Sequence, residues 1–367
     1  MKKILFSVTN DLNSDQRMWR ICNSLSMAGY EVVLVGRQMP DSRSLPKRNY
    51  LQHRMQLFFR KGPLFYLEYN LRLFLYALGS RVDVYSAVDL DSLPAMWLAS
   101  TIRNQPLVYD AHELFTEVPE LKPGGLKQRC WKAIEGFLLP RIRHAYTVNH
   151  SLAQWYGAKY GIQMAVVRNM PVTRKLPAHQ VGEFILYQGA LNAGRGLEAL
   201  LDAAPQLPLP VHIAGKGDLT EWLVMEIQRR GLGNRVKWLG QLDPEALQQL
   251  TAHAWLGINL LEGRSLNYYY SLANKFFDYV QAGVPQLCAD FPEYAALNQQ
   301  YEVALLTESH QTAAWLPMVE ALWHNREHYE RLQANCREAS RIWTWESEEK
   351  VLLDFYEGVL VRRPVRK

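Results

Sequence analysis

The sequence predicts an α/β protein with two Rossmann-like domains, and three observations lead to this prediction. Its 367 residues suit two domains better than one. Short apolar runs alternate with longer helical stretches in both halves, as in parallel sheets covered by helices. A polar, Pro-containing segment without periodicity, residues 171–182, separates the two series and is the expected linker.

In both halves the strand-like runs alternate with helical segments, as a doubly wound fold requires. The first half holds residues 3–8, 31–36, 82–87, 106–111, 145–149 and 164–169. The second half holds residues 184–189, 210–215, 235–240, 256–261, 286–290 and 302–306. Right-handed helical crossovers between such strands build one parallel layer in each half. We therefore expect two layers that share an architecture but not a sequence.

The composition, with 48% hydrophobic and 21% charged residues, is typical of a soluble globular protein. No apolar run reaches the ~18 residues of a bilayer-spanning helix, and the N-terminal segment becomes polar too soon for a signal peptide. The four cysteines lie far apart, without metal-ligand spacing. We expect reduced thiols, a cytoplasmic location at the inner face of the membrane, and no metal site.

Charge is distributed unevenly along the chain. Residues 1–170 hold 22 Lys and Arg against 13 Asp and Glu, a balance of +9, whereas residues 171–367 hold 19 against 23, a balance of −4. A basic first half suggests that it meets an anionic surface or acceptor. Nucleic acid is not an expected partner, because the basic residues are scattered and no recognised binding motif accompanies them.

Residues 256–290 predict a strand, a Tyr-rich loop, a helix and a second strand. The helix is expected to begin near Ser271 or Asn274, which suit an N-cap, and to stop at Gly283. Its N-terminal amides then lie at the carboxyl edge of a sheet, where they suit a phosphate. Asp278 shares a face with Asn274 and is placed to accept hydrogen bonds from ribose hydroxyls. The alternative is a solvated Asp on an amphipathic helix.

The segment SLANKFFDYVQAGVP resembles the nucleotide-sugar signature of the GT4-type retaining glycosyltransferases (glycosyltransferase group 1). That family has the GT-B fold, two Rossmann-like domains that face a central cleft. Asp278, Gly283 and Pro285 match the signature, with Asp in place of the usual Glu. At Tyr270 the family often has a second Glu, so the sugar and the detail of catalysis stay open. The donor-binding residues that the resemblance implies here are Ser271, Asn274, Lys275 and Asp278.

Two other strand ends place a cation beside glycines. Arg195 follows Gly189 in YQGALNAGRG, and Lys216 follows Gly215 in IAGKGD. Glycine lets a backbone approach a ligand closely, and a cation in such a loop suits pyrophosphate. The full dinucleotide fingerprint is absent, which argues against a dehydrogenase. Arg195 and Lys216 match the basic pair that grips the donor diphosphate in the family, and Gly189 and Gly215 are expected beside the donor.

Candidate site residues in the first half also follow predicted strands. His112 comes directly after the run 106–111, where ligands sit in open α/β sheets. A lone His is more often structural, but similar transferases have a His at this strand end, which implies a catalytic role near the donor sugar. Glu113, Asp15 and Arg17 are expected acceptor contacts. The alternative for the last two is an N-cap Asp and a surface Arg.

In residues 54–78, three basic residues, Arg54, Arg60 and Lys61, precede an apolar helix. One stripe at helical spacing contains Leu64, Leu67, Leu71, Phe74 and Leu78. Core packing is the default interpretation of such a stripe. The alternative is that the surrounding basic and aromatic surface contacts an anionic membrane, where a lipid-linked acceptor lies. Residues 122–143, also basic and aromatic, are a second candidate for this contact.

Together these features predict an acceptor domain over residues 1–172, a donor domain over 173–345, and a C-terminal helix over 346–367 that crosses back to the first domain, as in similar proteins. We expect transfer of a sugar from a nucleoside-diphosphate sugar, UDP-sugar by preference, to a hydroxyl of a glycan or lipid-linked acceptor in polysaccharide biosynthesis. The resemblance implies retention of configuration and no metal or other cofactor. The alternatives are a UDP-sugar 2-epimerase-like isomerase and a non-catalytic UDP-binding relative.

Overall fold

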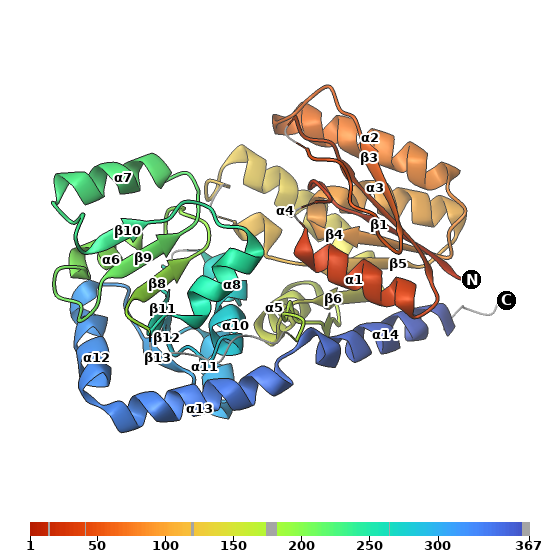
Figure 1. Ribbon diagram of the computed structural model, residues 1–367. Coiled ribbons are helices and arrows are strands. Elements are labelled where there is room, and N and C mark those ends of the chain that lie inside the picture. The colour runs from red at the N-terminus through yellow and green to blue at the C-terminus, as the bar shows by residue number, and fades with distance from the viewer. Residues whose placement is uncertain (14, 41, 119–120, 174–181, 264, 362–367) are drawn as a thin grey trace. The chain divides into compact units, whose positions relative to one another are not determined.

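The computed structural model describes the whole chain except residues 14, 41, 119–120, 174–181, 264 and 362–367 (Figure 1). It divides into two compact units. Unit 1 comprises Met1–Asn169 and Trp345–Lys367, and unit 2 comprises Met170–Thr344. Most of the expected linker, residues 174–181, lies outside the described residues. Each unit is a parallel α/β layer, so the predicted fold class is confirmed.

Seven strands of the described part of unit 1 form one parallel sheet. They are β1 (Lys3–Ser7), β2 (Glu31–Arg37), β3 (Leu51–Met55), β4 (Val84–Val88), β5 (Leu107–Ala111), β6 (His144–Thr147) and β7 (Ala165–Val166). Their order is β3-β2-β1-β4-β5-β6-β7. The sequence pattern missed β3, because its residues LQHRM are mostly polar. An edge strand tolerates such residues, since it needs no second apolar face.

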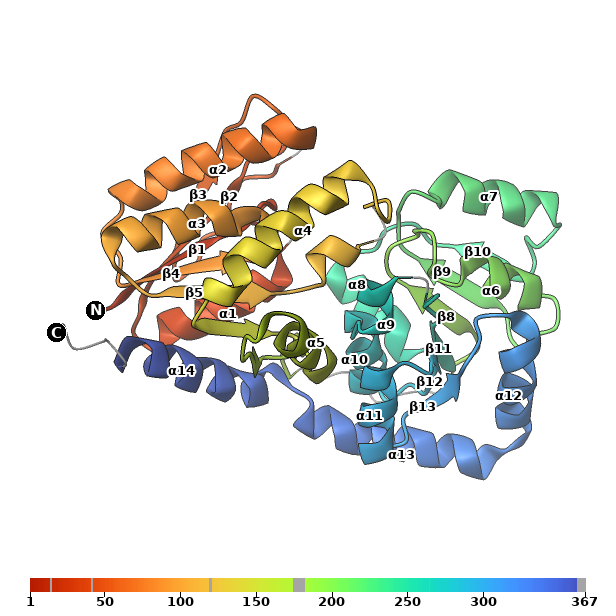
Figure 2. The same cartoon turned by 180° about the vertical axis from the view of Figure 1, so that it is seen from behind.

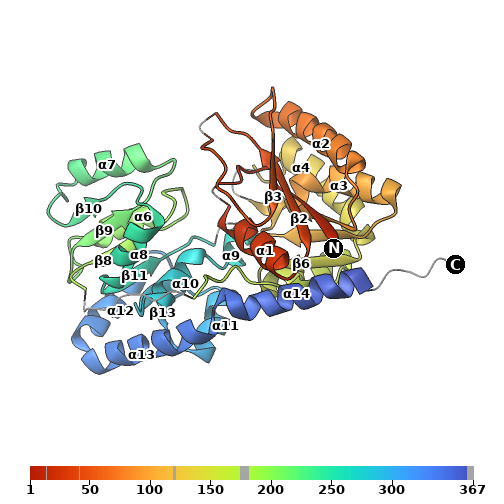
Figure 3. The same cartoon turned by 45° about the vertical axis from the view of Figure 1, so that its right-hand side comes forward.

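The helices of unit 1 cover both faces of this sheet. They are α1 (Gln16–Met27), α2 (Gly62–Gly79), α3 (Asp89–Arg103), α4 (Leu126–Leu138), α5 (His150–Tyr160) and α14 (Trp345–Val361), with short 3-10 turns η1 (Phe115–Glu117) and η2 (Leu139–Arg141). Figure 2 shows α2, α3 and α4 on one face. The other face carries α1 with α14 beside it (Figure 3).

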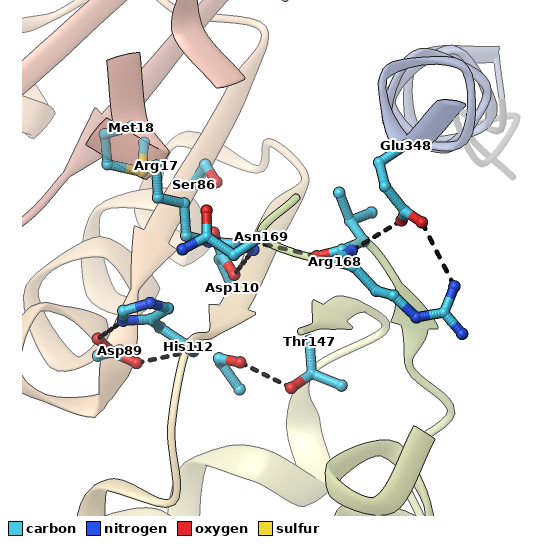
Figure 4. A network of polar contacts seen from close by, with 12 residues as sticks. Arg17, Met18, Ser86, Asp89, Asp110, His112, Thr147, Arg168, Asn169 and Glu348 are labelled. Atoms are coloured by element: carbon cyan, nitrogen blue, oxygen red, sulfur yellow. Dashed lines mark hydrogen bonds and ion pairs between the residues drawn. The ribbon is translucent and has the colours of Figure 1, made fainter. Parts of the chain in front are cut away.

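Buried polar contacts tie α14 to unit 1. Trp345 Nε1 donates to Ser24 Oγ at 2.9 Å, and the hydroxyls of Tyr356 and Ser86 lie 2.9 Å apart. Glu348 accepts hydrogen bonds from the backbone N–H of Arg168, at 2.8 Å, and from its guanidinium, at 3.3 Å (Figure 4). The chain thus leaves unit 1 after Asn169 and returns to it at Trp345.

The core-facing side of α2 differs from the prediction. The residues that α2 buries are Phe65, Tyr69, Leu73 and Ala77. Core packing of the stripe of Leu64, Leu67, Leu71, Phe74 and Leu78 is therefore wrong: the three leucines before Phe74 are exposed, and Phe74 and Leu78 are half-buried. The reason is that α2 is apolar almost all round, so periodicity could not choose between two apolar faces.

Unit 2 holds a second parallel sheet, with six strands among its described residues. They are β8 (Ile185–Gln188), β9 (Val211–Ala214), β10 (Val236–Trp238), β11 (Leu256–Asn259), β12 (Gln286–Ala289) and β13 (Ala304–Thr307), in the order β10-β9-β8-β11-β12-β13. The strand order reverses between β8 and β11. Ligands of open α/β sheets bind outside the carboxyl ends of the strands at such a point.

The helices of unit 2 are α6 (Leu197–Ala203), α7 (Thr220–Arg229), α8 (Pro244–Ala252), α9 (Leu266–Tyr269), α10 (Asn274–Gln281), α11 (Pro292–Gln300), α12 (Thr312–His324) and α13 (Arg326–Ile342). Helix α6 buries Leu197, Leu200 and Leu201 against the sheet. Among the described residues of both units, no helix is long and apolar enough to cross a bilayer.

Candidate functional site

Two glycines bring the loops after β8 and β9 into contact at the carboxyl edge of the unit 2 sheet. Gly189 and Gly215 have φ of +119° and +151°, and a Cβ at Gly215 would lie 1.9 Å from the carbonyl oxygen of Gly189. The positive φ at both positions, and the lack of room for a Cβ at Gly215, require glycine. Leu191 N–H donates to the carbonyl of Lys216 at 3.1 Å. The loops that carry Arg195 and Lys216 therefore lie side by side.

The loop after β11 joins this pair. Glu262 N–H donates to the carbonyl of Gly194 at 2.9 Å, and the guanidinium carbon of Arg195 lies 5.7 Å from the ring centre of Tyr268. A Cβ at Gly196 would lie 2.7 Å from Cβ of Leu260, so this approach also requires glycine. The loops after β8, β9 and β11 thus converge at the switch point of one sheet.

Helix α10 begins at Asn274 and stops before Gly283, as predicted, but its N-cap residue differs from the prediction. Its N-cap is Ala273, whose side chain cannot cap, so capping by Ser271 or Asn274 is wrong. The Ser271 hydroxyl instead donates to the carbonyl of Tyr268 at 2.8 Å, and the N–H of Ala273 donates to the Tyr294 hydroxyl at 3.0 Å. The helix ends at Gln281, followed by Gly283 with φ of +71°.

Asp278 and Asn274 share the exposed face of α10, as predicted, while Phe276, Phe277 and Val280 are buried in the core. Asp278 Oδ2 accepts a hydrogen bond from Gln188 Nε2 at 3.1 Å. Gln188 in turn accepts from the hydroxyl of Thr251 at 2.7 Å. Sequence reasoning missed Gln188, although its place at the last residue of β8, directly before Gly189, was a usable signal.

Lys275 is buried beside these residues, with 6% of its surface exposed. Its ammonium lies 4.2 Å from the ring centre of Tyr187 and has no hydrogen-bond partner among the described residues. Burial, reinforced by the positive charge of Arg195, lowers the pKa of Lys275 to about 7. Arg195 Nε is also buried without a partner in the described part of the chain. Two cations without hydrogen-bonded acceptors favour an anionic ligand.

In unit 1, His112 follows β5 and is half-exposed. Its backbone N–H donates to Asp89 Oδ1 at 2.9 Å, and its Nδ1 lies 3.9 Å from Asp89 Oδ2 (Figure 4). Asp89 has φ of +57°, which is uncommon for a residue with a side chain and is found at functional sites. Sequence reasoning missed Asp89, although it follows β4 directly, as His112 follows β5.

Asp91 adds a second carboxyl to this strand end. It is buried, and its Oδ2 accepts a hydrogen bond from the Thr9 hydroxyl at 2.5 Å. Burial, reinforced by the negative charge of Glu113, raises the pKa of Asp91 to about 7. Burial and Glu113 also raise the pKa of Asp89. The strand end beside His112 can therefore hold a proton at neutral pH.

The expected acceptor residues occupy three different environments in unit 1. Asp15 caps α1 by accepting from the N–H of Met18 at 2.9 Å. The alternative of a surface Arg17 is wrong, because Arg17 is 3% exposed and forms an ion pair with Asp110 at 2.8 Å. Glu113 is half-buried, and its carbonyl accepts from the Tyr156 hydroxyl at 3.1 Å. Contact of these three residues with an acceptor stays a prediction.

Two such parallel layers in one chain are the architecture of the GT-B fold, and the chain resembles solved structures along nearly its whole length. Sucrose-phosphate synthase from Thermosynechococcus elongatus aligns with 99% of this chain and 100% of its own, at a TM-score of 0.81 and 15% identity. HepE from Anabaena, in complex with UDP and glucose, aligns with 98% of this chain and 100% of its own, at a TM-score of 0.76 and 17% identity.

Two family models match the sequence. Glycosyl transferases group 1 matches residues 173–339, and Glycosyl transferase 4-like domain matches residues 14–173. The chain therefore belongs to the GT4-like glycosyltransferase family. O-antigen chain mannosyltransferase C from Escherichia coli is 45% identical over 62 residues, a match that spans 17% of this chain and 16% of that protein.

Proposed function

We propose that this protein transfers a sugar from a UDP-sugar to a hydroxyl of a glycan or lipid-linked acceptor, with retention of configuration and without a metal ion. The observation that carries the proposal is the convergence of Arg195, Lys216 and Lys275, in the first turn of α10, at the switch point of unit 2. HepE binds UDP and glucose, and the Escherichia coli relative is a mannosyltransferase of O-antigen chains. Both support a nucleotide-sugar donor and a glycan product.

Each residue then has a defined task. Arg195 and Lys216 stabilise the negative charge of the departing diphosphate, and the first-turn amides of α10 bind its oxygens. These two cations and the helix dipole offset the negative charge of the diphosphate, which supports catalysis without a metal ion. Asp278 accepts hydrogen bonds from the ribose, held in place by Gln188. His112 contacts the donor sugar. The acceptor oxygen bonds to the anomeric carbon as the bond to phosphate breaks, and the leaving phosphate takes the acceptor proton.

A panel of nucleotide sugars tests the proposal. Thermal unfolding of the full chain in each compound identifies the bound donor, because a ligand that binds only the folded state raises the melting temperature. Products of the bound donor are then analysed without and with acceptor glycans. Transfer or slow hydrolysis supports a transferase. An epimerised nucleotide sugar would assign the protein to the 2-epimerase-like isomerases, and tight binding with no turnover would make it a non-catalytic UDP-binding relative.

Lys275 should make donor binding depend on pH. Free Lys275 is largely neutral above pH 7, and a bound diphosphate favours its charged form, so binding takes up a proton. We expect UDP affinity to fall by up to about tenfold per unit between pH 7.5 and 8.5, where the terminal phosphate, with a pKa of about 6, keeps a constant charge. Isothermal titration calorimetry measures this slope.

Two variants separate this linkage from other causes. Lys275→Met should abolish the slope and raise the melting temperature at pH 7, because burying an ammonium without a partner costs free energy. The groups that face Lys275 are Tyr187, Arg195 and Cys288. Lys216→Ala is the matched control and should weaken UDP binding while keeping the slope. Equal slopes in the wild type and Lys275→Met would contradict the assignment.

A further inference from the structure

Helix α2 presents a row of leucines to solvent. Leu64, Leu67, Leu71 and Leu75 are 53%, 67%, 57% and 59% exposed. Their spacing of three to four residues places them on one face, opposite the buried face of the same helix. A row of four exposed leucines is unusual, because soluble proteins rarely expose large contiguous apolar patches without a function.

Neighbouring segments extend this surface. Phe58, just before α2, is 84% exposed, and Phe59 is 46% exposed. On α3, Leu98 and Ile102 are exposed as well. The guanidinium of Arg103 donates to the carbonyl of Leu78, so the C-terminal end of α3 lies along that of α2 (Figure 2). The leucines of α2 with these four side chains are called the α2 face below.

The charges around the α2 face are mostly positive. Arg60 and Lys61 are exposed between Phe59 and the start of α2. The carboxylate of Glu68 accepts from the N–H groups of Phe58 and Phe59 at 2.9 to 3.1 Å and pairs with Arg72 at 2.8 Å. The negative charge of Glu68 is therefore compensated by these partners within the α2 face. The remaining charge suits an anionic partner.

We propose that the α2 face docks on an anionic lipid bilayer, a role beyond the proposed sugar transfer. An amphipathic helix that lies in the bilayer interface buries its apolar side among acyl chains and pairs its cations with anionic headgroups. The four leucines would lie among the acyl chains, and Arg60 and Lys61 would pair with the anionic headgroups. A second copy of this chain fits the charges less well, because a symmetric interface would bring the same cations together.

Sedimentation of the full chain with lipid vesicles tests the proposal. We expect binding to vesicles of phosphatidylcholine with 30% phosphatidylglycerol, and weak binding to pure phosphatidylcholine. Leu67→Glu with Leu71→Glu should lower the partition coefficient at least about tenfold, and Arg60→Ala with Lys61→Ala at least about fivefold, with the second loss disappearing at high salt. Met225→Glu, on an exposed methionine of α7, is the control and should bind like the wild type.

Thermal unfolding of each variant in the absence of vesicles checks that it folds, which is expected because the replaced side chains are exposed. The proposal is overturned if the wild type does not sediment with anionic vesicles at low salt. It is also overturned if the leucine variant sediments like the wild type, or if light scattering shows a wild-type dimer that the leucine variant loses, since the α2 face would then bind a second copy.

Discussion

Replacing both Arg195 and Lys216 by Ala should lower the affinity for UDP by about a hundredfold or more. A hydrogen bond to a charged group contributes about 1.5–3 kcal/mol, which is roughly a factor of ten or more in affinity for each residue. Leu191 N–H bonds to the carbonyl of Lys216, which holds the two loops together, so both cations can reach one diphosphate. Isothermal titration calorimetry without divalent metal measures the loss.

The matched control changes the same charge elsewhere in unit 2. Arg229 and Arg341 are exposed, and each pairs with a Glu on its own helix. Replacing both by Ala removes two positive charges, so it reports the general effect of net charge on a nucleotide anion. We expect a change of less than about threefold at physiological salt, because exposed charges more than a Debye length away are screened. Undiminished UDP affinity in Arg195→Ala with Lys216→Ala would refute the diphosphate assignment.

His112→Ala and Asp278→Ala should fail in different ways. Asp278 lies on α10, where its carboxylate accepts a hydrogen bond from Gln188, and the proposed function assigns it to the ribose, far from the bond that breaks. Asp278→Ala should therefore weaken UDP itself by about tenfold or more. His112 belongs to unit 1 and is assigned to the sugar, whose shape and charge change during the reaction. His112→Ala should keep UDP affinity and lower turnover by ~100-fold or more.

Titration of UDP into both variants, followed by turnover at saturating donor, separates the two roles. Asp278→Asn is the matched variant of the first residue, because its amide oxygen can still accept the hydrogen bond from Gln188, while its NH2 group offers the ribose a donor in place of the second carboxylate oxygen. We expect it to bind UDP more tightly than Asp278→Ala. If His112→Ala loses UDP binding as severely as Asp278→Ala, or if neither variant loses activity, the division of labour between the two residues is wrong.

The sequence predicted the layers well because their strands are buried on both faces. Each predicted run overlaps a strand, and among the described residues only β3, a polar edge strand, was missed. Periodicity was less informative on α2, where two apolar faces compete and the sheet takes the one with Phe65 and Tyr69. A period of 3.6 residues shows that a helix has faces, but not which face meets the core.

Candidate site residues could be named from the sequence where a motif contains them, but not where only tertiary contacts bring them to the site, and their roles stay predictions. Arg195 and Lys216 stand beside glycines, a signal in the sequence itself. Gln188 and Asp89 act through hydrogen bonds to residues 90 and 23 positions away, and only the fold brings those partners together. The burial of Lys275 also depends on Tyr187, which lies on a strand far away in sequence.

The return of α14 to unit 1 sets the order in which the protein can fold during synthesis. Tyr356 is fully buried and bonds to Ser86, yet the ribosome makes these two residues 270 positions apart. Unit 2 is complete in sequence at Thr344, before α14 exists. Until α14 is made, unit 1 exposes the apolar surface along α1 that α14 later covers, although unit 2 can already fold. Nascent chains stalled near residue 344 should therefore be the form that chaperones capture.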